Sequence, residues 1–196
     1  MNGANYQRRL AVLMLGAILG ACSSPNPTLY TIAPVAGSEQ SDGPKVVLLQ
    51  QIGLDRYLER SQIVRSSENY RLDVMANDWW GEPLSAMLSR VLVTELSQRL
   101  PRSTVISENG AVSAPADATI ELNVQRLDKD ASDTLVLQAQ AGVIFRGRNA
   151  PALQSFRITA RPQTPDTPGE VAAISTAVGQ LADGLAAMVR AGPSAR

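Results

Sequence analysis

The chain has 196 residues, with 18 basic and 18 acidic side chains, no histidine and a single cysteine. Its length suits one domain with a tail, and without a basic excess to neutralise phosphates, nucleic-acid binding is disfavoured. The lack of histidine excludes Ser-His-Asp and Cys-His catalysis and His-ligated zinc. One cysteine excludes Cys-cluster metal sites and an internal disulfide.

The N-terminal segment has the layout of a secretory signal. Arg8 and Arg9 end a short n-region, an apolar run follows from Leu10 to Leu19, and small residues lead to Cys22. This run is shorter than the roughly 20 apolar residues of a transmembrane helix, so we expect residues 1–21 to be removed. Their loss leaves 16 basic against 18 acidic residues.

The tetrapeptide Leu19-Gly20-Ala21-Cys22 resembles the lipobox of lipoprotein signal peptidase. Cleavage after Ala21 would expose Cys22 for lipidation, and acyl chains contribute about 0.8 kcal/mol per buried methylene. The alternative is an ordinary cysteine that lies there by chance. Ser23 follows, where an aspartate would resemble an inner-membrane retention signal. We therefore expect a lipid anchor on the periplasmic face of the outer membrane.

The next residues predict a tether and two short strands. Residues 22–28 hold the lipidated cysteine and a polar tether with two prolines. Residues 29–34 favour a strand, and residues 35–44 have the composition of a loop. The run Val46-Val47-Leu48-Leu49 within residues 45–52 predicts a strand buried on both faces.

A hairpin and a helix follow. Residues 62–64 and 70–75 favour strands, and the polar residues 66–69 between them favour a turn. From Pro83 the period changes to that of an amphipathic helix, with Pro83 expected in the first turn and the end of the helix at Pro101. Its apolar stripe consists of Leu84, Met87, Leu88, Val91, Leu92, Leu96 and Leu100.

Three segments with a period of two come next, around residues 118–125, 135–146 and 152–160. Each alternates apolar with polar residues, which predicts an antiparallel meander with one dry and one wet face. A final helix should begin with Thr167 as N-cap, Pro168 in the first turn and Glu170 as a capping-box partner. Its stripe is Val171, Ile174, Val178, Leu181, Leu185 and Met188.

These elements predict an α+β fold: a twisted, mainly antiparallel sheet with two amphipathic helices packed on one face. We expect a single periplasmic domain over residues 29–192 and a tail at 193–196. The sequence has no Gly-x-Ser-x-Gly elbow, Walker A loop or Rossmann fingerprint. We therefore expect no enzyme activity, no cofactor and no metal ligand.

Two segments are denser in charged and aromatic residues than a scaffold requires. They are residues 54–64, with Tyr57 and Arg60, and residues 77–84, where Trp79 and Trp80 stand at the expected start of a helix. Adjacent helical positions point about 100° apart, so both indole rings cannot face one core. The ordinary interpretation of Trp80 is a core anchor.

Together with the lipobox and the Leu-Tyr-Thr-Ile segment at 29–32, these two segments resemble the PqiC family of ABC-type transport auxiliary lipoproteins. The resemblance implies an accessory lipoprotein of an MCE-type system, which moves lipids between the inner and outer membranes and maintains envelope integrity. Its partners would be an MCE-domain protein and inner-membrane components, with a homo-oligomer as a further possibility. We expect Tyr57, Arg60, Trp79 and Trp80 to contribute to a partner interface, because Trp, Tyr and Arg are enriched at interface hot spots.

Two other functions compete with this one. A monomeric periplasmic lipoprotein could bind a small apolar ligand, which requires a closed apolar cavity of roughly 300 Å³ or more. An envelope hydrolase is disfavoured by the missing histidine. The sequence does not identify the lipid carried or the direction of transport.

Overall fold

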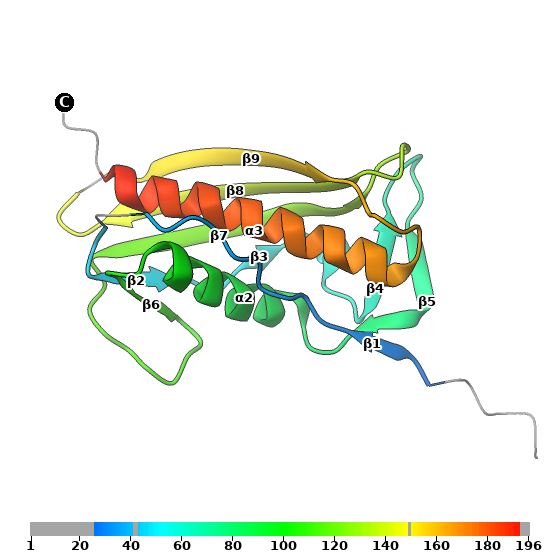
Figure 1. Cartoon of the computed structure of the whole chain (residues 1–196), viewed down its shortest axis with the longest axis horizontal. Coiled ribbons are helices and arrows are strands. Elements are labelled where there is room, and N and C mark those ends of the chain that lie inside the picture. Colours follow the sequence, from blue (N-terminus) through cyan, green and yellow to red (C-terminus); the bar gives the residue numbers. More distant parts are fainter. Residues whose placement is uncertain (1–25, 41–42, 149, 193–196) are drawn as a thin grey trace, which may run out of the picture.

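The computed structural model describes residues 26–40, 43–148 and 150–192 (Figure 1). The expected signal sequence with Ala21, the expected lipidation site Cys22 and the tail 193–196 lie outside the described residues. The elements in chain order are β1 (Thr28–Tyr30), β2 (Val46–Leu49), β3 (Gly53–Leu54), the 3-10 helix η1 (Arg56–Leu58), β4 (Gln62–Ser66), β5 (Asp73–Trp80), α2 (Leu84–Arg99), β6 (Thr104–Ser107), β7 (Ala118–Lys129), β8 (Leu135–Phe145), β9 (Ala152–Ala160) and α3 (Thr167–Ala191).

The sheet is built around β7. On one side β8 pairs antiparallel with β7 and β9 with β8, which confirms the meander. On the other side β7 pairs in parallel with β2, β3 and β4 at successive points along its length. β5 is antiparallel to β4, which confirms the hairpin, and β1 and β6 add parallel edges. The α+β class is confirmed, in a mixed sheet whose longest pairings are antiparallel.

One strand that the periodicity did not reveal is β6. Its four residues follow α2 and pair in parallel with β2, so the connection between these two strands runs through β3, η1, β4, β5 and α2. The expectation that β2 is buried on both faces is wrong. Val47 and Leu49 are buried, whereas Val46 and Leu48 are half-buried, because the helices cover one face of the sheet.

Both helices lie on that face, side by side (Figure 1). Every residue of the two predicted stripes is buried, because the apolar face of each helix packs against the sheet and the other helix. By length and composition alone α3 could cross a membrane, but 67% of its most apolar window is buried inside the domain. α3 is therefore the core helix of the fold.

Both helix starts differ in detail from the prediction. Pro83 has a non-helical ψ of 130°, so it occupies the N-cap of α2 rather than the first turn. The N-cap of α3 is Asp166, whose Oδ1 accepts a hydrogen bond from the Gly169 backbone N–H at 3.0 Å. Glu170 is therefore one position too far along for a capping box, and it turns into the core beside Lys129.

The segment between β1 and β2 looks like a loop in sequence but is fastened to both helices. Ala33 N–H donates to Ser175 Oγ of α3 at 3.2 Å, and Val35 N–H donates to Glu95 Oε1 of α2 at 2.7 Å. In Figure 1 this blue segment, which is neither helix nor strand, runs across α2 and α3. The residues that follow the tether are thus part of the packed structure.

Arg99 of α2 also binds the segment between β1 and β2 and fastens it to α3. It is 1% exposed, and its guanidinium donates to the Val35 and Gly179 carbonyls at 3.2 and 3.0 Å and to Asp183 Oδ1 at 2.5 Å. The absence of a side chain at Gly37 makes room for this group, since a Cβ there would lie 2.3 Å from the guanidinium carbon. One arginine therefore joins α2, α3 and the N-terminal segment.

Candidate functional site

The two dense segments of the sequence meet in space. Trp80 N–H donates to the Ser61 carbonyl at 2.7 Å, which joins the turn after η1 to the end of β5. Between them lies an open cleft of about 430 Å³, lined by Leu54 and by residues 59–61 and 80–85. We call it the motif cleft.

The two tryptophans are at the end of a strand, not at the start of a helix, so that expectation is wrong. Successive side chains of a strand point to opposite faces. Trp80 points into the core and is 7% exposed. This confirms its interpretation as a core anchor. Trp79 is half-buried on the opposite face, and its Nε1–H donates to the Ala76 carbonyl at 3.0 Å.

Tyr57 is held inside a polar network. Its hydroxyl donates to Oδ2 of the fully buried Asp128 at 2.8 Å, and Arg126 Nε donates to Oδ1 of the same carboxylate at 2.8 Å. Arg126 also pairs with Glu68 at 2.6 Å. Burial, together with the negative charge of Asp128, raises the pKa of Tyr57 above its ordinary value. This network fixes η1 against β7 and the β4–β5 turn.

Arg60 is the predicted site residue that lies most openly at the surface. Its Nε–H donates to the Tyr57 carbonyl at 3.0 Å, which orients the exposed guanidinium at the cleft. On the far rim Glu82 pairs with Arg90 at 2.6 Å. The cleft therefore offers charges of both signs around the Trp80 side chain, an arrangement suited to binding a polar surface or peptide.

The structure brings the four predicted residues into one region but gives them different environments. Arg60 and Trp80 line the motif cleft, whereas Tyr57 lies in the partly buried polar network and Trp79 on the outer face of β5. The network partners Glu68, Arg126 and Asp128 were not anticipated. Their one sequence signal is the pair of charges at Arg126 and Asp128, two residues apart on one strand and so on one face.

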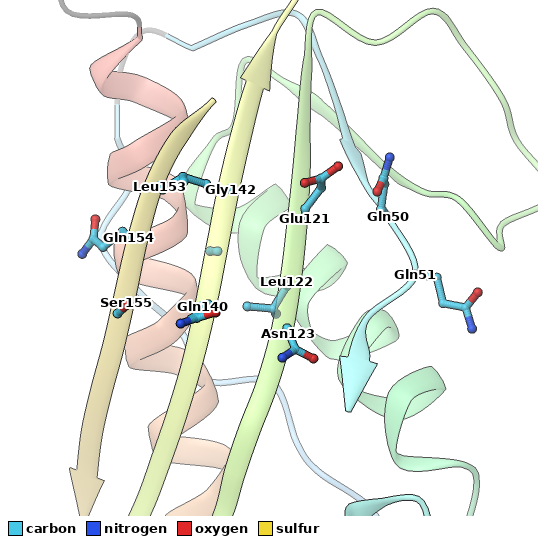
Figure 2. Close-up of a pocket in the computed structure, with 11 residues that line it drawn as sticks. Gln50, Gln51, Glu121, Leu122, Asn123, Gln140, Gly142, Leu153, Gln154 and Ser155 are labelled. Atoms are coloured by element: carbon cyan, nitrogen blue, oxygen red, sulfur yellow. The ribbon is translucent and has the colours of Figure 1, made fainter. Parts of the chain in front are cut away.

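A second concavity lies on the sheet face opposite the helices (Figure 2). It is an open trough of about 470 Å³. Figure 2 shows Glu121 and Asn123 on β7, Gln140 on β8 and Gln50 after β2 along it. Gly142 contributes depth, because a Cβ there would lie 3.2 Å from the Leu153 side chain. The alternation of the meander predicts these polar positions but not their concave arrangement.

Neither concavity brings together the ligands of a metal ion. Within the described ranges, no group of three or more His, Cys, Asp or Glu side chains could hold one. The motif cleft provides carboxylate and guanidinium groups, and the trough provides amide and carboxylate groups. These groups can form hydrogen bonds and ion pairs with a bound partner.

Comparison with known proteins gives concordant results. A family model described as "ABC-type transport auxiliary lipoprotein component" matches residues 28–186. The chain is 28% identical over 95 residues to the intermembrane transport lipoprotein PqiC of Escherichia coli (strain K12) and, with the same figures, to that of Shigella flexneri. The match covers 46% of this chain and 51% of each relative, so the chain spans about half the length of the curated relatives it matches.

Two solved structures share the fold. A crystal structure of an uncharacterized protein superposes with a TM-score of 0.70 at 16% identity, covering 83% of this chain and 97% of the other. A protein from Xanthomonas campestris superposes with a TM-score of 0.66 at 17% identity, covering 81% and 92%. At these identities the likeness concerns the fold alone. Because the family model matches most of its length, the chain belongs to the ABC-type transport auxiliary lipoprotein family.

Proposed function

We propose that this protein is a non-catalytic accessory subunit of an MCE-type lipid transport system, anchored through a lipid on Cys22 to the periplasmic face of the outer membrane. The observation that carries the proposal is the family match over residues 28–186, together with curated relatives that are named intermembrane transport lipoproteins. The lipobox before the described residues supports the anchor. The system would maintain the integrity of the envelope.

The shape of the domain favours an accessory role over the competing one. A carrier of a small apolar ligand needs a closed apolar cavity. The motif cleft and the sheet-face trough are open, and charged or amide side chains line both. The space between the sheet and the helices is filled by the core.

We propose the motif cleft as the contact with the MCE-domain protein. Arg60 supplies an exposed guanidinium with five donors, a group enriched at interface hot spots. Trp80 and Tyr57 act as positioning residues, since Trp80 forms the floor and Tyr57 accepts the Arg60 Nε–H bond through its carbonyl. The cleft thus presents a charged group on a rigid base.

Co-purification of the full lipidated chain with the MCE-domain protein of the same cells tests this contact. Arg60→Ala should lower the amount of MCE protein recovered. The matched control is Arg157→Ala, which removes an exposed arginine from β9, away from the cleft. Equal recovery with wild type and both variants would rule out the cleft as the contact.

The anchor has its own test. Cys22→Ala removes the chain's one thiol, so an acyl analogue fed to cells should label the wild type and not the variant. The variant should accumulate as uncleaved precursor. Label retained by Cys22→Ala would show that the chain is not a lipoprotein anchored at this residue.

A further inference from the structure

Trp79 is the predicted site residue that neither the motif cleft nor the polar network uses. The strand register pairs it with Leu29 of β1, at the edge of the sheet. Leu29 is 63% exposed and Trp79 is half-buried. Because paired residues of neighbouring strands project from the same face of a sheet, the two side chains form one apolar surface. We call it the edge patch.

The polar groups beside the edge patch allow it to leave water. Trp79 Nε1–H already donates to the Ala76 carbonyl at 3.0 Å, so the indole would lose no hydrogen bond. Asp78 faces the other side of the sheet, where its Oδ2 accepts a hydrogen bond from the Thr167 hydroxyl of α3 at 3.2 Å. On β4 the neutral Gln62 pairs with Trp79. Covering the edge patch therefore does not require burial of the Asp78 carboxylate.

The edge patch lies where the chain enters the domain. Thr28 is the sixth residue after Cys22, and a fully extended chain of that length spans only ~20 Å. Leu29 follows directly. The start of β9 lies at the opposite end of the molecule (Figure 1), and α3, which runs between the two ends, is about 37 Å long by its residue count. An acyl chain on Cys22 would thus keep the edge patch within reach of the bilayer.

We infer that the edge patch, Leu29 and Trp79, lies in the headgroup region of the bilayer that holds the anchor. Tryptophan is enriched at membrane–water interfaces, and the exposed leucine adds apolar area. The bilayer is the occupant because the short tether holds it close to the patch, whereas a protein would have to be recruited there. The inference rests on the proposed lipid anchor. It adds an orientation, with the domain standing on its β1–β5 edge.

Site-specific fluorescence of the lipidated protein tests the orientation. Lipidation of Cys22 consumes the native thiol, so Leu29→Cys provides one site for a bimane label in the edge patch. The near control is Thr31→Cys, because Thr31 is exposed but its Oγ1 accepts a hydrogen bond from Arg90 Nη2 of α2 at 3.1 Å and so faces the helix. The distant control is Leu153→Cys, at a position that is 76% exposed at the start of β9.

The labelled proteins are reconstituted into vesicles of phosphatidylethanolamine and phosphatidylglycerol, with or without acyl chains brominated to quench the label. Tryptophan emission of the unlabelled protein is a second readout. It is compared with the emission of Trp79→Phe, in which the remaining Trp80 is buried.

All variants should float with the vesicles. Brominated lipid should quench the label at residue 29, quench the label at residue 31 less, and leave the label at residue 153 unchanged. It should also lower the tryptophan emission of the unlabelled protein, with a smaller loss in Trp79→Phe.

If all variants float and neither the label at residue 29 nor the tryptophan emission is quenched, the edge patch does not enter lipid and is available to water or to a protein. Equal quenching at residues 29 and 31 would reflect closeness to the anchor alone and would overturn the contact. Failure to float would instead contradict the anchor itself, and the inference would fall with it.

Discussion

Glu170 is one of the few buried ionisable side chains among the described residues. It is 2% exposed near the start of α3, where Lys129 Nζ lies 3.8 Å from Oε2, and Oε1 has no hydrogen-bond partner. Burial raises the pKa of Glu170 to about 7, although the charges of Lys129 and Arg65 oppose the shift. The protein therefore carries a carboxyl group that its fold prefers protonated.

This preference predicts a pH dependence of stability. The pKa of Glu170 is raised from 4.5 to about 7 on folding, so between these values the folded state holds a proton that the unfolded state releases. The free energy of unfolding should fall as pH rises through this window and level off above it. In Glu170→Gln the free energy of unfolding should not fall in this window, because glutamine does not ionise. The variant should therefore be more stable than wild type at pH 8, by at most about 3 kcal/mol, with no gain near pH 4.5.

Urea unfolding at the two pH values measures the difference. Glu121→Gln, at an exposed position of the sheet-face trough, is the matched control and should shift stability little at either pH. A Glu170→Gln variant that unfolds more easily than wild type at pH 8 would mean that the ion pair with Lys129 outweighs the burial of the carboxylate.

Arg99 is the second residue whose burial makes a prediction. Arg99→Met removes the hydrogen bonds to the Val35 and Gly179 carbonyls and leaves the buried Glu95 without its neighbouring positive charge. Breaking a buried charged network costs about 3–5 kcal/mol. Arg90→Met breaks the exposed pair with Glu82 and should cost less than about 1 kcal/mol. Equal melting temperatures for the two variants would contradict the role given to Arg99.

At the scale of elements, α3 dominates the packing. It contacts β7, β8, β9 and α2, and Gly184 permits the close approach to β9, because a Cβ there would lie 2.4 Å from the Phe156 ring. A helix with so many neighbours fixes the position of the others. Its removal from the sheet would expose the core of the whole domain.

Leu181→Asp tests this position of α3. Leu181 is completely buried, so the change loses its packing, about 2–5 kcal/mol, and adds the cost of a buried charge. That is comparable to the stability of a small domain. The neighbouring Gln180→Asp places the same charge on the exposed face of the helix and should melt near wild type. A cooperative melt of Leu181→Asp at the wild-type temperature would contradict the packing.

The local patterns of the sequence predict the helices and strands far better than they predict which strands pair with each other. The stripes of both helices and the alternation of the meander come from repeats within one element, and the structure confirms them. Parallel pairing joins segments that are far apart, as β2 and β6 are, and four residues such as Thr104–Ser107 leave no periodic signal. The capping position of α3 shifted by one residue, because aspartate and threonine are both good N-caps and stand side by side.

The sequence also predicts some features of the candidate site and misses others. The density of charged and aromatic residues in two segments pointed to Tyr57, Arg60, Trp79 and Trp80, and the structure brings Arg60 and Trp80 to one cleft. Alternate positions along the strands predict the polarity of the trough, but its depth depends on the missing side chain of Gly142. That depth does not follow from alternation, which distinguishes the two faces of a sheet and says nothing about their shape.

At the scale of the whole molecule, β1 connects the proposed anchor with the motif cleft. The tether enters at Thr28, and two residues later the Tyr30 carbonyl accepts the Gly81 N–H at 2.9 Å, at the edge of the cleft. The cleft is thus a short distance from the end of the domain that the anchor would hold at the membrane. A partner that crosses the periplasm would meet it close to the bilayer.

Phospholipid exchange between the two membranes tests the proposed function most directly. Cells that lack this protein receive labelled phospholipid precursor, and the label is followed in separated inner and outer membranes. Deletion should slow the equilibration of label between the fractions, the wild-type chain should restore it, and Cys22→Ala should not. Equilibration at the wild-type rate in the deletion strain would contradict a role in intermembrane lipid transport.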